Sequence, residues 1–159
     1  MKLLREILHK VEINSVVGNT SLSINKIEFD SRLISDGDMY IAITGVNVDG
    51  HSFISQAIKN GANCIVCEKI PDNKTDGVVY VNVKSSRKAL AIISSNYFDN
   101  PSSKLNLIGV TGTNGKTTIA TLLFDLYTEL EIKSGLISTV KISYDNKNFQ
   151  SNQTTPDSL

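Results

Sequence analysis

Seven consecutive residues in the second half of the chain are of types that bind phosphate. They are Gly112, Thr113, Asn114, Gly115, Lys116, Thr117 and Thr118. Glycines let backbone N–H groups approach phosphate oxygens, a lysine reaches the terminal phosphates, and a hydroxyl at a helix N-terminus can bind Mg²⁺. The segment therefore predicts a nucleoside triphosphate site in which Lys116 contacts the phosphates and Thr117 holds the metal.

The glycine spacing of this segment departs from the strict G-x-x-x-x-G-K-[ST] pattern. That pattern requires a glycine where Val110 stands, and Gly109 lies one residue too early. For Gly-Lys-Thr alone, a solvated turn with a helix cap would be the simpler interpretation. The flanking sequence favours phosphate binding, because it predicts a buried strand over residues 105–110 and an amphipathic helix over residues 116–130. The apolar stripe of that helix consists of Ile119, Leu122, Leu123, Leu126 and Leu130.

A phosphate loop does not catalyse phosphoryl transfer without a carboxylate that binds the metal. Beyond Val140 the carboxylates are Asp145, in a predicted turn, and Asp157, next to the last residues. This disfavours a small P-loop kinase or a GTPase-like switch. One strand-helix-strand unit also cannot cover both faces of a parallel sheet. We therefore expect the chain to be an N-terminal piece of a longer protein.

Length and charge exclude several classes of partner. The chain has 159 residues, 40% of them hydrophobic, which is enough for a globular core. Its 16 Lys and Arg residues balance 16 Asp and Glu residues, so no net field recruits nucleic acid or an anionic membrane. No apolar run approaches the roughly 18 residues that a membrane-spanning helix needs. We expect a cytoplasmic protein without an export signal or membrane insertion.

The two cysteines invite a metal or redox interpretation, because Cys64 and Cys67 stand in a Cys-x-x-Cys arrangement. The segment around them reads as a buried strand, in which side chains three positions apart point to opposite faces. The two histidines, His9 and His51, are far away in sequence and offer no second ligand pair. A structural role for both thiols is therefore favoured.

The first hundred residues alternate short apolar runs with segments of helical spacing, which predicts a mixed sheet with helices packed on it. Helices are predicted over residues 3–11, 52–60 and 86–98, with Ser52 as the cap of the second. Strands are predicted over residues 22–29, 39–43, 64–67 and 78–83. A polar, proline-bearing segment, residues 99–104, is the predicted domain boundary.

After this boundary, the strand over residues 105–110, the long helix and a strand over residues 135–140 form one unit, and a hairpin is predicted over residues 141–150. The predicted fold is α/β. It has an N-terminal mixed-sheet domain, residues 1–100, followed by the truncated start of a parallel-sheet P-loop domain, residues 105–159.

The run Thr111-Gly112-Thr113-Asn114-Gly115-Lys116-Thr117 resembles the phosphate loop of the Mur ligase family, which has this glycine placement. Folylpolyglutamate synthetases share the loop, so it alone indicates ATP-dependent amide-forming ligases. Upstream, the segments at residues 29–32, 37–42 and 45–53 resemble the substrate domain of the Mur ligases that add the third peptide residue to UDP-N-acetylmuramoyl-L-alanyl-D-glutamate. The resemblance also covers Gln153-Thr154-Thr155-Pro156-Asp157, and so essentially the whole chain.

The resemblance implies a set of ligands and contacts. Residues 112–118 would bind ATP with Mg²⁺ on Thr117, and Lys116 would offset charge on the transferring phosphate as a catalytic group. The partners would be the UDP-muramoyl dipeptide and an amino acid, joined through an acyl phosphate. Residues implied in binding the UDP-sugar peptide are Ser31, Val46, Asn47, Val48, Gln153, Thr154 and Thr155.

Simpler interpretations stand beside these. Asp30-Ser31-Arg32 can be a strand-end turn in which a side chain bonds its own backbone. His51 is expected to be a partly satisfied surface histidine or a helix-capping neighbour, without a catalytic role, and Thr154-Thr155-Pro156 can be extended chain. At the level of function, the alternatives are a UDP-sugar or nucleotide binding module without turnover, and a folylpolyglutamate-type ligase.

Overall fold

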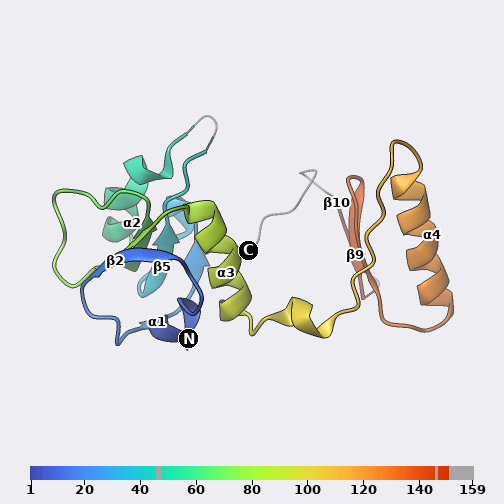
Figure 1. Cartoon of the computed structure of the whole chain (residues 1–159), viewed down its shortest axis with the longest axis horizontal. Helices are drawn as coiled ribbons and strands as arrows, with labels where there is room; N and C mark the ends of the chain where they lie inside the picture. Colours follow the sequence, from blue (N-terminus) through green and yellow to red (C-terminus); the bar gives the residue numbers. More distant parts are fainter. Residues whose placement is uncertain (46–47, 146, 151–159) are drawn as a thin grey trace. The chain divides into compact units, whose positions relative to one another are not determined.

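The computed structural model describes residues 1–45, 48–145 and 147–150. The chain separates into two compact units, one from Met1 to Lys104 and one that begins at Leu105 (Figure 1). The first unit contains, in chain order, β1 (Lys2–Leu3), α1 (Leu4–Ile7), β2 (Ile13–Val17), β3 (Ser23–Ile24), β4 (Ile27–Glu28), η1 (Ser31–Leu33), β5 (Asp38–Ile41), η2 (Gly50–Phe53), α2 (Ile54–Lys59), β6 (Ala62–Cys67), β7 (Val79–Val83), α3 (Ser86–Tyr97) and η3 (Pro101–Lys104).

A five-stranded sheet in the order β2-β7-β6-β5-β4 is the framework of the first unit. Strands β4, β5, β6 and β7 run parallel, and β2 pairs antiparallel with β7. The α/β class with a mixed N-terminal sheet is therefore confirmed. Because the four parallel strands point the same way, the segments that follow them emerge at one edge of the sheet.

Both faces of this sheet are buried. Met39 and Ile41 of β5 belong to one apolar cluster, which α1 and α3 complete, whereas Tyr40 belongs to a second cluster that includes residues of α2. The alternation follows the two-residue period of a strand. It also places Cys64 and Cys67 in different clusters, which confirms that the two thiols lie on opposite faces of β6.

Two predictions about the first unit are wrong in detail. Residues 22–29 do not form one strand, since β3 pairs with β1 in a separate sheet and β4 pairs with β5. Ser52 does not cap α2, because Asp49 caps the preceding η2 turn through the backbone N–H of His51. The helix predicted over residues 3–11 is only the short α1.

The edge strand β2 has no counterpart among the predicted strands. All five of its residues are exposed or nearly so, and it contains the polar pair Asn14 and Ser15. Its pairing partner, β7, lies more than sixty positions further along the chain. The side-chain amide of Asn14, for example, donates a hydrogen bond to the side-chain carbonyl of Asn82. Such a strand depends on a distant partner, which a local hydrophobic pattern does not reveal.

The second unit contains α4 (Lys116–Glu129) and an antiparallel sheet of β8 (Gly135–Ile137), β9 (Lys141–Tyr144) and β10 (Lys147–Gln150). The helix and the hairpin of β9 and β10 confirm their predictions. The strand predicted over residues 105–110 is wrong here, because that segment pairs with no strand among the described residues and Leu107 is 94% exposed. A buried parallel strand needs neighbours on its edges. The parallel sheet expected for this unit stays a prediction.

Within the described ranges, no helix combines the length and apolar character needed to cross a bilayer.

Candidate functional site

Several polar side chains of the first unit lie at the carboxyl edge of its sheet, where the parallel strands end. Asp30 and Ser31 follow β4, Thr44 follows β5, Glu68 follows β6, and Ser86 begins the helix after β7. Open α/β sheets bind ligands at the carboxyl ends of their strands, where loops and helix N-termini converge. This edge is therefore the candidate binding site of the first unit.

Ser31 sits in a turn held by its two neighbours. Asp30 accepts the backbone N–H of Arg32 at 3.0 Å and pairs with its guanidinium at 2.6 Å from Nη2 to Oδ2. These bonds lower the pKa of Asp30 to about 2, and the bond from the Arg32 side chain has the larger effect. Ser31 is buried, and its backbone carbonyl accepts the side-chain amide of Asn60 at 2.8 Å. The predicted strand-end turn is confirmed, and it holds Ser31 in one place at the sheet edge.

The loop between β5 and η2, residues 42–49, follows the strand that pairs with β4. Of the residues expected to line the UDP pocket here, Val46 and Asn47 lie outside the described residues, and Val48 is exposed. Thr44 and Asp49 pair across the loop, and Gly45 donates its N–H to the Val48 carbonyl at 2.9 Å. Ser31 and Val48 thus lie in the segments that follow two adjacent parallel strands, β4 and β5.

Tyr40 ties the end of this loop to the sheet. Its hydroxyl donates to the carbonyl of Gly50 at 2.9 Å, and Gly50 donates its N–H to the carbonyl of Ile43 at the same distance. Burial raises the pKa of Tyr40 to about 12, with a further contribution from the negative charges of Asp30 and Asp49. The phenol is therefore a neutral donor at physiological pH.

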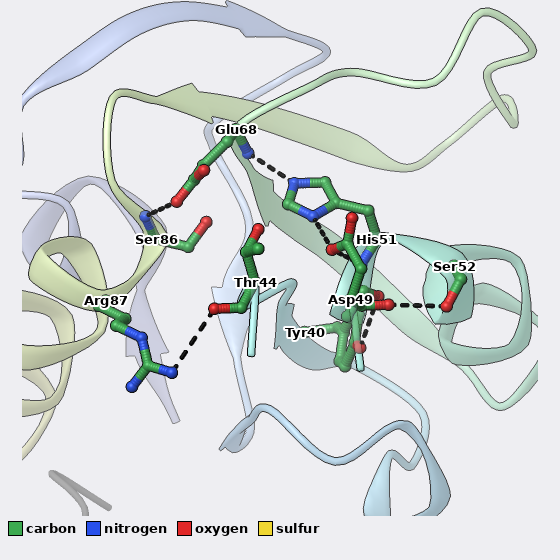
Figure 2. A network of polar contacts seen from close by, with 9 residues as sticks. Tyr40, Thr44, Asp49, His51, Ser52, Glu68, Ser86 and Arg87 are labelled. Carbon is green, nitrogen blue, oxygen red and sulfur yellow. Dashed lines mark hydrogen bonds and ion pairs between the residues drawn. The ribbon is translucent and has the colours of Figure 1, made fainter. Parts of the chain in front are cut away.

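His51 lies next to the residue that caps η2, as one of its two predicted interpretations has it, but it is more buried and better bonded than a surface histidine. Its side chain is only 15% exposed, and both ring nitrogens have partners (Figure 2). Nδ1 lies 2.7 Å from Asp49 Oδ1, and Nε2 lies 2.9 Å from the backbone nitrogen of Glu68. Asp49 also accepts the backbone N–H of His51, which is the first cause of its lowered pKa. No local signal in the sequence reveals the bond to Glu68, because this partner follows β6, 17 positions further along the chain.

The hydrogen bonds continue from His51 to helix α3. Glu68 accepts the backbone N–H of Ser86 at 2.9 Å, so that a carboxylate caps the helix N-terminus. Arg87 in the same turn reaches the carbonyl of Thr44 at 3.5 Å (Figure 2). The ends of β5 and β6 and the start of α3 therefore form one connected polar network.

The second unit contains the phosphate loop. Gly112 and Gly115 have φ angles of +150° and +76°, which side-chain-bearing residues rarely adopt. Gly115 caps α4 without a side-chain bond to the first-turn N–H groups. The Lys116 ammonium bonds the carbonyls of Gly112 and Thr113 at 2.5 and 3.1 Å. The donor set, a helix N-terminus without a side-chain cap and with Lys116 and Thr117 on its first turn, fits a magnesium-bound polyphosphate.

The remaining predicted residues lie either outside the described residues or away from the sheet edge and the phosphate loop. Gln153, Thr154 and Thr155 lie outside the described residues. Cys64 and Cys67 are buried and unpaired, and burial raises the pKa of both thiols, that of Cys67 to about 11. In the part of the chain that the structure describes, no cluster of three or more His, Cys, Asp or Glu side chains could hold a metal ion.

Two family models match the sequence. The first, described as the Mur ligase family, catalytic domain, matches residues 23–98, and the second, the Mur ligase middle domain, matches residues 110–159. The UDP-N-acetylmuramoyl-L-alanyl-D-glutamate--2,6-diaminopimelate ligase of Cytophaga hutchinsonii is 46% identical over 98% of this chain and 32% of its own length. The ligase of the same name from Clostridium tetani is 43% identical over 98% of this chain and 33% of its own. The chain spans about a third of the length of these relatives.

Solved structures share the fold. A ligase of that same name aligns with 100% of this chain and 32% of its own, at a TM-score of 0.74 and 24% identity. A MurF ligase from Thermotoga maritima in complex with ADP aligns with 66% of this chain and 23% of its own, at a TM-score of 0.52 and 32% identity. The arrangement of elements described above therefore recurs in experimentally determined ligases.

Proposed function

The chain belongs to the Mur ligase family, and from this premise we propose that it is part of an ATP-dependent ligase of peptidoglycan precursor synthesis. The whole protein would add the third amino acid to UDP-N-acetylmuramoyl-L-alanyl-D-glutamate. The observation that carries the proposal is the 40 to 46% identity to ligases of this name over 98% of the chain. Such a role is cytoplasmic and supports cell-wall growth, and through it cell shape and division.

The two units would divide the substrates between them. Ser31 and residues 46–48 would bind the UDP moiety at the carboxyl edge of the first sheet, and the position of Ser31 directly after β4, where open α/β sheets bind ligands, supports this. Residues 153–155 would hold the muramoyl peptide. Residues 112–118 would bind ATP, with Mg²⁺ on Thr117. The open N-terminus of α4 and the backbone angles of Gly112 and Gly115 support this part of the proposal.

The chemistry follows from the substrates. The D-glutamate carboxylate attacks the terminal phosphoryl group of ATP, which gives an acyl phosphate and releases ADP. The amine of the incoming amino acid then displaces phosphate and forms the amide. Lys116 would lower the energy of the first step, because its positive charge offsets charge that grows on the transferring oxygens. Mg²⁺ bound through the Thr117 hydroxyl would supply further charge stabilisation.

We propose 2,6-diaminopimelate as the incoming amino acid, because the ligases from Cytophaga hutchinsonii and Clostridium tetani carry it in their names. The test uses the whole protein and measures phosphate release from ATP. Release is expected only when the UDP-muramoyl dipeptide and diaminopimelate are both present, with L-lysine as the comparison. Equal ATP hydrolysis without either substrate would contradict the ligase proposal, and a preference for L-lysine would contradict only the choice of amino acid.

The chain by itself is expected to bind without turnover, since it spans about a third of its relatives. Isothermal titration calorimetry with UDP-N-acetylmuramoyl-L-alanyl-D-glutamate tests this. Heat that saturates at one ligand per chain supports the pocket at the first sheet. Absence of heat at millimolar ligand would count against it.

A further inference from the structure

One imidazole links the end of the loop between β5 and η2 to the end of β6. On one side His51 bonds Asp49, the last residue of the loop, and on the other it bonds the backbone of Glu68 at the end of β6. Asp49 in turn pairs with Thr44 across the loop. Figure 2 shows the ring between these partners, pointing from η2 toward the end of β6.

The two bonds require one tautomer of the ring. A backbone N–H can only donate, so Nε2 must accept from Glu68 and carries no proton. The proton of the neutral ring is therefore on Nδ1, where it is donated to the Asp49 carboxylate over 2.7 Å. In free histidine the proton prefers Nε2, so this arrangement is a measurable consequence of the network.

We infer that His51 is a positioning residue for UDP-sugar binding, held as the Nδ1–H tautomer, which sets the loop between β5 and η2 against the end of β6. The inference rests on the proposed function of the sheet edge. His51 acts through Asp49 and not by contact with the substrate, because both ring nitrogens are committed and the side chain is mostly buried. The loop that it holds carries Val48, one of the residues assigned to the UDP moiety.

The rest of the network supports this role. Gly50, which precedes His51, is fixed by bonds to Tyr40 and Ile43, so the backbone on the η2 side of the loop is already rigid. Glu68 is fixed by its bond to the Ser86 N–H and by the Asn82 amide, which donates to its carbonyl at 2.9 Å. The imidazole thus joins two rigid elements, and its loss would free the loop without unfolding either of them.

The first experiment reads the tautomer in the unmodified 159-residue chain. The sequence has two histidines, so two sets of imidazole ¹⁵N resonances are expected in a long-range ¹H–¹⁵N spectrum, and the His9→Gln variant assigns them. His9 is exposed and lies outside the network. We expect His51 to show a protonated Nδ1 and an unprotonated Nε2. A protonated Nε2 in the neutral ring would overturn the inference, whatever the chain binds.

The second experiment separates the two bonds. An asparagine amide can take the place of Nδ1 and a glutamine amide that of Nε2, so His51→Asn retains the bond to Asp49 and His51→Gln retains the bond to Glu68. Each variant loses one of the two hydrogen bonds of the His51 ring. This loss is expected to weaken the affinity for UDP-N-acetylmuramoyl-L-alanyl-D-glutamate roughly five- to tenfold in each variant. In the whole protein the same variants should raise KM for this substrate and leave kcat within about a factor of two.

The control is His9→Gln, which should bind like the unmodified chain. Affinities within twofold of the unmodified chain in both His51 variants would overturn the inference while leaving the proposed function intact. Failure of the unmodified chain to bind would instead contradict the proposed function, and with it the link to substrate. A loss of kcat without a change in KM would also overturn a positioning role.

Discussion

Gly50 offers a sharp test of how tightly the site loop is packed. A Cβ atom added at this position would lie 2.7 Å from the Ile43 nitrogen and 2.8 Å from the Ile43 carbonyl oxygen. Both are backbone atoms two residues beyond the end of β5, so no side-chain rotation relieves the overlap. Gly50→Ala must therefore shift the loop away from the sheet.

The cost of this shift has two parts. Overpacking in a well-packed region costs about 1 to 3 kcal/mol. The shift also weakens the bonds that Gly50 makes with Ile43 and Tyr40, each worth about 0.5 to 1.5 kcal/mol. We expect Gly50→Ala to lower the free energy of unfolding of the first unit by roughly 3 kcal/mol. For a unit of this size, that corresponds to a fall of about 12 to 24 °C in Tm.

Urea denaturation followed by near-UV circular dichroism measures this change. The chain has no tryptophan, and Tyr40 and Tyr80 are fully buried in the first unit, so their signal reports its tertiary structure. Gly77→Ala is the matched control, because Gly77 has a φ of +83° but no heavy atom within 4 Å of the added Cβ. It should cost only about 1 kcal/mol, from the backbone angle. A cost for Gly50→Ala no greater than that of Gly77→Ala would refute the packing argument.

Three further predictions concern the phosphate loop, the turn at Ser31 and the cysteines. Lys116→Ala in the whole protein should lower kcat by about 10² to 10³, measured as phosphate release, because no other group replaces its charge on the transferring phosphate; an unchanged kcat would remove Lys116 from catalysis. Asp30 has a folded-state pKa of about 2, below its unfolded value, so it contributes stability that is present above about pH 4 and is lost as the pH falls toward 2. Asp30→Asn should therefore flatten the dependence of the urea midpoint on pH between about 4 and 2, and an unaltered slope would show that the pair with Arg32 is not maintained in solution. Cys64 and Cys67 are buried with raised pKa values, so neither should react with a disulfide reagent at pH 8 until the chain is denatured, and rapid reaction of the native chain would contradict their burial.

Local patterns in the sequence were sufficient for the elements whose contacts are nearby. Helix α4 begins at Lys116, as predicted from the apolar spacing over residues 116–130, and α3 begins at Ser86, directly after the Ser85 side chain that accepts the Lys88 N–H. The two-residue period of β6 was sufficient to place the Cys64 and Cys67 side chains on opposite faces. In each case the determining interactions span a few residues, so composition and spacing carry the information.

Family resemblance in the sequence also indicated Ser31 and residues 46–48 as parts of one pocket, although it did not say how they meet. The sheet topology places the strands that precede Ser31 and Val48 side by side. These residues follow β4 and β5, which are neighbouring parallel strands, and parallel strands end at the same edge. For Ser31, residues 46–48 and residues 153–155, the assignments to the substrate site stay predictions from sequence.

Only the tertiary structure decided the role of His51 and the failure of residues 105–110 to form a strand. The bond from Glu68 to the imidazole spans 17 positions, and the bond from Ser86 to Glu68 spans 18, so neither is visible in a local pattern. An apolar run becomes a strand only when other strands flank it, and the described residues of the second unit supply none beside residues 105–110. Sequence determined which side chains were available, whereas pairing between distant segments determined which of them are buried, bonded and held in place.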